Sequence, residues 1–262
     1  MYWWIGHKFQ RAVRVGIAGF ATVFAFWGGS GAAAQTAAAG QIWEPVRVAT
    51  YHFPPKSYLD DGAVKGSNIV LQRALFEEAG LKYEFRFFTT SRIYNELKSK
   101  QSLVHAWISI DIARVRPLAM PVKPSIFGPL RLGLIGLAGN KPPAFADLKA
   151  QNLIIILGFT YGGYFNKLKS GWPDMNLVTA PNRKSAFRML KAGRARYLFN
   201  YYAETAPIAV SQGVVNMEVT PVYEWLNYLF VSRNAPNAAL LHARLEAAAK
   251  RIAARNHAAV KK

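Results

Sequence analysis

Short apolar segments of strand length alternate with segments of helical character through most of the chain. The first series runs from residues 46–50 through a helical segment at 67–79 and an alternating segment at 83–87 to a further strand at 106–110. Strands that alternate with helices favour a sheet of parallel strands joined by crossover helices. We therefore predict an α/β fold with a sheet rich in parallel strands.

The predicted helices of this series have capping residues at their ends. Ser67 or Asn68 can cap the first helix, and Gly80 can end it in a left-handed conformation. Ser91 can cap the second helix, which carries Ile93 on its apolar face.

A second α/β series follows Pro143. Residues 153–157 form a continuous apolar strand, and further strands are predicted at 177–179 and 197–199. The helix between the last two strands begins after Asn182 and ends at Gly193.

Two extended segments separate and rejoin the two series. Residues 125–138 are apolar without a helical stripe, and residues 223–231 lead back to a terminal helix with an apolar stripe. We predict two α/β lobes joined by two crossover segments. The first lobe comprises residues 42–131 and 222–257, the second comprises 132–221, and 258–262 form a frayed tail.

The amino terminus has the pattern of a secretory signal peptide. Basic residues precede an apolar run at 15–27, and small residues follow it. We predict cleavage after Ala34, with Ala39 as the alternative site, and a disordered leader at 35–41. A retained membrane anchor is the other interpretation, but the apolar run is shorter than the ~20 residues that span a bilayer. The expected location is outside the cytoplasm.

The chain is strongly basic, with 33 Lys and Arg against 14 Asp and Glu, for a net charge of +19. Three basic residues precede the predicted cleavage site, which leaves 33 − 3 − 14 = +16. An anionic partner and a merely solvated basic surface both fit this charge. Export argues against nucleic acid as the partner, and the chain has no cysteine for a disulfide.

The motifs of common enzyme classes are absent from the sequence. It has no nucleophile elbow, zinc-protease motif or phosphate loop, and its histidines lack metal-ligand spacing. The adjacent acids Asp60–Asp61 and Glu77–Glu78 have structural explanations in a turn and at a helix end. We predict no metal, no cofactor and no enzymatic activity.

Aromatic residues gather where predicted strands end. Tyr51 and Phe53 follow the first strand, Phe159 and Tyr161 follow the strand at 153–157, and Tyr201 follows that at 197–199. Ligands of parallel sheets bind at the carboxyl ends of strands, so these residues are binding candidates, although packing between lobes would also explain them. The glycine-rich turn at 158–163 can offer backbone N–H groups to an anion, or can serve only the geometry of the turn.

The order of these segments resembles the bacterial periplasmic solute-binding proteins of family 3. The resemblance covers residues 44–254 and rests on the strand and Pro-Pro loop at 46–55, on the helix start at 66–71 and on residues 145–149. It continues through Gly158-Phe159-Thr160 and the segment 186–194.

This resemblance implies a two-lobed fold of periplasmic-binding-protein type II, with a cleft that closes on a small ligand. In the family an arginine of the first lobe holds the ligand carboxylate, and Arg114 or Arg116 is the candidate here. The family's aspartate for the ligand amino group is replaced by Tyr201, with Asn200 beside it. We therefore expect a neutral or anionic solute rather than a standard amino acid. The predicted ligand-binding residues are Tyr51, Phe53, Arg92, Arg114, Arg116, Phe159, Thr160, Tyr161, Asn200 and Tyr201.

The function expected from the resemblance is delivery of a small solute to an inner-membrane ABC permease or another membrane partner, by a monomer. A periplasmic acid/base enzyme on the same scaffold is one alternative, with Asp111 or Glu204 as the acid. An accessory or sensor protein with a degraded ligand site is the other.

Overall fold

The computed structural model describes residues 44–110, 113–149, 152–203 and 205–260. The predicted signal peptide and leader lie outside these residues, as do Asp111 and Glu204. Residues 43–262 form a compact unit by themselves, and its hydrophobic cores are built from its own side chains.

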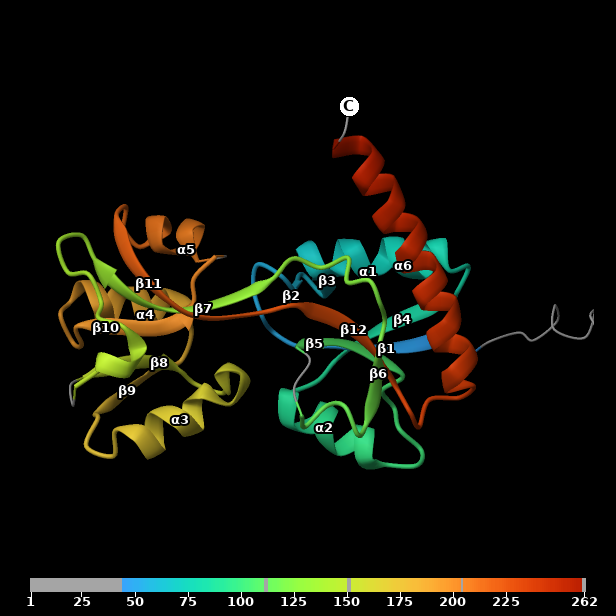
Figure 1. Cartoon of the computed structure of the whole chain (residues 1–262), viewed down its shortest axis with the longest axis horizontal. Helices are drawn as coiled ribbons and strands as arrows, with labels where there is room; N and C mark the ends of the chain where they lie inside the picture. Colours follow the sequence, from blue (N-terminus) through green and yellow to red (C-terminus); the bar gives the residue numbers. More distant parts are fainter. Residues whose placement is uncertain (1–43, 111–112, 150–151, 204, 261–262) are drawn as a thin grey trace, which may run out of the picture. The chain divides into compact units, whose positions relative to one another are not determined.

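The first sheet has the strand order β4-β1-β5-β12-β6 (Figure 1). β1 pairs in parallel with β4 and β5, whereas β12 is antiparallel to β5 and β6. Its strands are β1 (Val46–Thr50), β4 (Tyr83–Phe87), β5 (Ala106–Ile110), β6 (Ala119–Pro121) and β12 (Asn227–Ser232). The same lobe carries the hairpin β2 (Tyr58–Asp60) and β3 (Ala63–Lys65) and the helices α1 (Ser67–Glu78), α2 (Thr90–Lys98) and α6 (Ala238–Val260).

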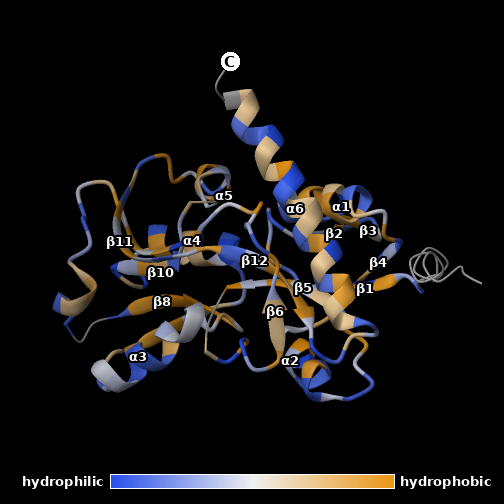
Figure 2. Cartoon of the chain, turned by 45° about the vertical axis from the view of Figure 1, so that its right-hand side comes forward, coloured by the Kyte–Doolittle hydropathy of each residue, from blue (hydrophilic) through white to orange (hydrophobic). Residues whose placement is uncertain are grey.

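The second sheet has the order β11-β7-β10-β8-β9, with β8 parallel to β9 and β10 and β7 antiparallel to its neighbours. Its strands are β7 (Leu130–Leu137), β8 (Leu153–Ile156), β9 (Leu177–Ala180), β10 (Tyr197–Tyr201) and β11 (Met217–Trp225). Its helices are α3 (Tyr164–Gly171), α4 (Arg183–Lys191) and α5 (Ala206–Ser211). The buried strand β8 is coloured as hydrophobic in Figure 2. The predicted α/β fold with two sheets is confirmed.

The chain crosses between the sheets after β6 and again at Leu226, between β11 and β12. Residues 130–131 and 222–225 belong to the second sheet, although the sequence analysis assigned them to the first lobe. The reason is that β7 and β11 stay paired to their ends, where Leu130 lies opposite Trp225. A sequence pattern marks extended backbone but does not show which sheet pairs with it.

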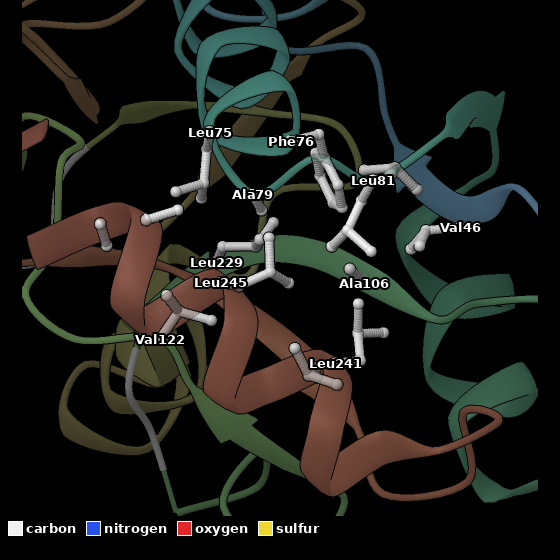
Figure 3. Close-up of a cluster of buried hydrophobic side chains, with 14 of the residues drawn as sticks. Val46, Leu75, Phe76, Ala79, Leu81, Ala106, Val122, Leu229, Leu241 and Leu245 are labelled. Carbon is white, nitrogen blue, oxygen red and sulfur yellow. The ribbon is translucent and has the colours of Figure 1, made fainter. Parts of the chain in front are cut away.

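The terminal helix α6 packs its apolar stripe against α1 and the first sheet (Figure 3). Leu241, Leu245, Ala248 and Ile252 are all buried there, as their helical spacing predicts. A frayed tail is predicted from residue 258, but the helix continues to Val260.

The helix caps agree only partly with prediction. The Asn182 side chain accepts a hydrogen bond from the Ser185 N–H at the start of α4, as predicted. α1, however, begins after Gly66 rather than Ser67 or Asn68, and α2 begins after Thr89 rather than Ser91. In the part of the chain that is described, no helix is both long and apolar enough to span a membrane.

Candidate functional site

A cleft of about 660 Å³ opens at the ends of strands from both sheets. The first lobe contributes the loop after β1, the end of β4, the start of α2 and the end of β5, and the second lobe contributes the turn after β8 and the end of β10. The residues that line it are Tyr51, His52, Phe53, Phe87, Phe88, Thr89, Thr90, Ser91, Arg92, Ile93, Tyr94, Trp107, Ile108, Ser109, Ile110, Leu130, Leu157, Gly158, Phe159, Thr160, Gly162, Tyr201 and Asn227.

One wall of the cleft is an aromatic cluster that joins the two lobes. The Phe53 ring centroid lies 5.4 Å from that of Phe159 and 5.6 Å from that of Tyr201. Tyr51 meets Phe53 edge to face at 6.0 Å. Such rings stack on flat apolar ligands and on one another, and each pair adds about 0.5–1.5 kcal/mol beyond area burial.

The start of α2 forms another part of the lining. Thr89 caps this helix by accepting the Arg92 N–H, and the hydroxyls of Thr90 and Ser91 also line the cleft. The Arg92 guanidinium lies 4.8 Å from the Phe88 ring and 3.7 Å from the Glu96 carboxylate. Hydroxyl donors, a guanidinium and the positive end of a helix dipole together suit an anionic or strongly polar ligand group.

Burial keeps the tyrosines of the cleft neutral. Desolvation raises the pKa of Tyr51 to about 12, and it raises the pKa of Tyr201 further in the same direction. Burial also raises the pKa of Tyr94, against the opposing effects of a Ser109 hydrogen bond and the Arg114 charge. These phenols act as hydrogen-bond donors and acceptors, not as bases.

Six of the ten predicted ligand-binding residues line this cleft: Tyr51, Phe53, Arg92, Phe159, Thr160 and Tyr201. They come from four separate segments of the chain, which supports the prediction that strand ends converge here.

The other four lie elsewhere. Tyr161 is fully buried, and its hydroxyl accepts the Ile156 N–H at 2.7 Å, so it is part of the second lobe's core. Asn200 precedes Tyr201 on β10, and neighbouring strand residues point to opposite faces of a sheet. Asn200 is therefore buried away from the cleft, and no described group forms a hydrogen bond with its side-chain amide.

Neither Arg114 nor Arg116 lines the cleft. The Arg114 guanidinium lies 3.9 Å from the Tyr94 ring, so it can influence the cleft through that side chain. Both arginines are exposed in the loop that follows β5.

Arg183, the first residue of α4, is not among the residues predicted from the sequence. This side chain is buried at 4% exposure, and its guanidinium lies 4.3 Å from the Phe53 ring and 5.2 Å from the Phe159 ring. It also donates a hydrogen bond to the Pro54 carbonyl, across the two lobes. Tyr94 and Trp107 were missed as well. A basic residue at a helix start carries no sequence signal for such a contact.

The glycine-rich turn serves packing more than anion binding. The N–H groups of Gly163 and Phe165 both donate to the Thr160 carbonyl, at 3.0 and 3.4 Å. At Gly162 a Cβ atom would lie 2.4 Å from the Trp225 ring, and φ is +62°. Geometry therefore explains this glycine without a ligand. The described residues also contain no group of three potential metal ligands.

Several solved structures are similar to this chain. A histidine kinase sensor domain with similarity to periplasmic binding proteins matches with a TM-score of 0.64 and 22% identity, over 81% of this chain and 92% of that one. An ancestral arginine-binding protein bound to arginine matches with a TM-score of 0.64 and 19% identity, over 81% and 93%. The arginine-, lysine-, histidine-binding protein ArtJ from Geobacillus stearothermophilus matches with a TM-score of 0.63 and 15% identity, over 82% and 91%.

No protein-family model and no curated protein sequence matches the chain. At such low identities the structural likeness shows the fold alone, which is the two-lobed, periplasmic-binding-protein-like α/β fold.

Proposed function

We propose that this protein is a periplasmic receptor that binds a small neutral or anionic solute in the cleft between its lobes. The observation that carries the proposal is the cleft itself, since it joins aromatic rings of both lobes to the hydroxyl-rich start of α2. The similar structures include proteins that bind amino acids, which supports a binding role for the fold.

The lining favours a solute with a flat apolar part and a polar or anionic group. The aromatic cluster of Phe53, Phe159 and Tyr201 would stack on the apolar part, and Arg92 with the α2 start would hold the polar group. The described lining residues include no Asp or Glu, and the net charge of +16 that remains after the predicted cleavage (33 − 3 − 14) repels a cationic solute on approach.

Export through the predicted signal peptide at 1–34 would place the receptor in the periplasm. The liganded protein would then act on a partner in the inner membrane, either an ABC permease or another membrane protein.

A sensor or accessory role is the second candidate. The rings that would grip a solute already pack on one another, and Phe53 and Tyr201 are each only 6% exposed. One of the similar structures is a histidine kinase sensor domain. In this role the closed cleft itself would be recognised, with no solute transported.

A thermal-shift screen of residues 43–262 separates these candidates. The panel contains aromatic carboxylates, other organic acids, amino acids and sugars. A solute at one hundred times its Kd adds about 2.7 kcal/mol to the free energy of unfolding, which raises the melting temperature visibly. No shift from any solute would reject the receptor and favour the sensor role. Turnover of a solute that binds would instead establish an enzyme.

The binding mode is tested with matched variants of α2. Arg92→Gln removes the guanidinium from the cleft, whereas Lys98→Gln removes a charge from the exposed end of the same helix. We expect Arg92→Gln to weaken binding of an anionic solute about tenfold or more, because a charge-assisted hydrogen bond is lost. Lys98→Gln should leave binding unchanged. Equal effects of the two variants would contradict this mode.

A further inference from the structure

The outer face of α4 carries a stripe of exposed basic side chains. Lys184, Arg188 and Lys191 are spaced by four and three residues and so lie on one side of the helix, opposite the buried Phe187 and Leu190. The loop after the helix adds the exposed residues Arg194 and Arg196, and Arg196 donates a hydrogen bond to the Asn140 side chain at 2.9 Å. Between residues 175 and 203 the sequence has six basic residues and no acidic one.

These cations have no carboxylate partner among the described residues, whereas some basic residues of the first lobe do. There, Arg86 pairs with Glu84 at 2.8 Å, and Arg255 pairs with Glu78 at 2.6 Å. No described carboxylate forms an ion pair with Lys184, Arg188, Lys191, Arg194 or Arg196. The exposed face of α4 and the loop after it therefore present five cations that have no carboxylate partner among the described residues.

Exposed aliphatic side chains lie beside this stripe. The Lys191 ammonium is 2.8 Å from the position that a Cβ atom would take at Gly213, in the turn after α5. On either side of this turn Val210 is 54% exposed and Val215 is 74% exposed. α4 and α5 contact one another within the same lobe (Figure 1). A basic stripe with adjacent aliphatic side chains is thus presented to solvent as one surface.

We propose that this α4–α5 face binds an anionic phospholipid surface. Its cations would contact lipid phosphates, while Val210 and Val215 would enter the apolar edge of the headgroup layer. A soluble polyanion would satisfy the cations alone and would gain nothing from the two valines, so the combination favours a membrane. The inference does not depend on the solute proposed for the cleft, because the stripe is not part of the cleft lining.

Vesicle sedimentation tests the proposal. Residues 43–262 are used because this unit forms its own cores and lacks the apolar run at 15–27. We expect binding to vesicles that contain phosphatidylglycerol, weaker binding at high salt and no binding to pure phosphatidylcholine. Because each cation near an anionic surface contributes roughly fivefold in affinity, the triple variant Lys184→Glu, Arg188→Glu, Lys191→Glu should bind at least about tenfold more weakly.

The control is the triple variant Lys82→Glu, Lys98→Glu, Lys100→Glu. It changes the net charge by the same amount, at exposed lysines of the first lobe. This variant should bind nearly as well as the unchanged protein. A loss equal to that of the α4 variant would overturn the proposal, since bulk charge alone would then explain binding.

The double variant Val210→Ser, Val215→Ser keeps the net charge. It tests the proposal even if the α4 triple variant fails to fold. It should weaken vesicle binding while leaving binding to polyphosphate unchanged. Binding of polyphosphate without any binding of anionic vesicles would also overturn the proposal.

Discussion

Arg183 joins the two lobes through a single buried side chain. Its guanidinium covers the rings of Phe53 and Phe159 and donates to the Pro54 carbonyl. In a buried position such a charge-assisted hydrogen bond and such cation–π contacts are stronger than at a surface. The side chain therefore contributes to the stability of the closed arrangement and holds two rings of the cleft, Phe53 and Phe159, from behind the lining.

Replacing this side chain should destabilise the protein. Arg183→Ala removes the hydrogen bond to Pro54 and both ring contacts, and we expect the free energy of unfolding in urea to fall by about 2–4 kcal/mol. The exposed neighbour gives the control, and Lys184→Ala should change the free energy by less than about 0.5 kcal/mol. Equal stability of the two variants would show that the contacts across the lobes contribute little.

His105 predicts a pH dependence of stability. Its Nδ1 accepts the Arg47 N–H at 3.1 Å, and burial together with the Arg47 charge lowers the pKa of the imidazole. The unfolded chain therefore binds a proton at higher pH than the folded chain, so stability is lost as pH falls through the unfolded pKa of about 6.5.

The matched variant is His105→Asn, which keeps an acceptor near the position of Nδ1 but does not titrate. Between about pH 7.5 and 5 the unchanged protein should lose more stability than this variant in urea titrations. Parallel curves for the two proteins would exclude His105 as the source of the pH dependence.

At the scale of helices and strands, the sequence predicts most elements because their signals are local. β1, β4 and β5 begin and end at the residues expected from period-two alternation or apolar runs. The start of α1 is not predictable in this way. The residue before α1 has to be a glycine, because a Cβ atom at Gly66 would lie 2.3 Å from the Lys56 carbonyl oxygen. This close approach of two backbone segments depends on tertiary structure.

A substitution at this helix start has a large expected cost. Gly66→Ala places a side chain at φ +125° and against the Lys56 backbone, and we expect the free energy of unfolding to fall by about 2–5 kcal/mol. Gly62→Ala is the control, since φ is +75° and nothing lies within 4 Å of the added Cβ, so its cost should be about 1 kcal/mol. Urea midpoints measure both. Similar costs would show that the backbone contact yields without difficulty.

At the scale of the whole molecule, the cleft was predictable in location but not in detail. The aromatic residues at strand ends predicted that Tyr51, Phe159 and Tyr201 meet in one cleft, because parallel strands bring their carboxyl ends together. The sequence could not show that Asn200 faces the opposite side of β10, since the strand register sets that direction. Nor could it show that Phe53 is covered by rings and by a guanidinium from the other lobe.

These contacts across the lobes predict that the protein is closed in the absence of a solute. Phe53 packs on Phe159 and Tyr201, and Arg183 reaches the Pro54 carbonyl, so opening the cleft would expose rings that are now buried. Small-angle X-ray scattering of residues 43–262 should give a radius of gyration that matches the closed structure, and the double variant Phe53→Ala, Arg183→Ala should give a larger one. The control pair Phe165→Ala, Lys184→Ala leaves the contacts across the lobes intact and should scatter like the unchanged protein. If the unchanged protein without solute is already as extended as the Phe53–Arg183 double variant, closure requires a ligand, because the contacts between the lobes are then too weak to hold the cleft shut.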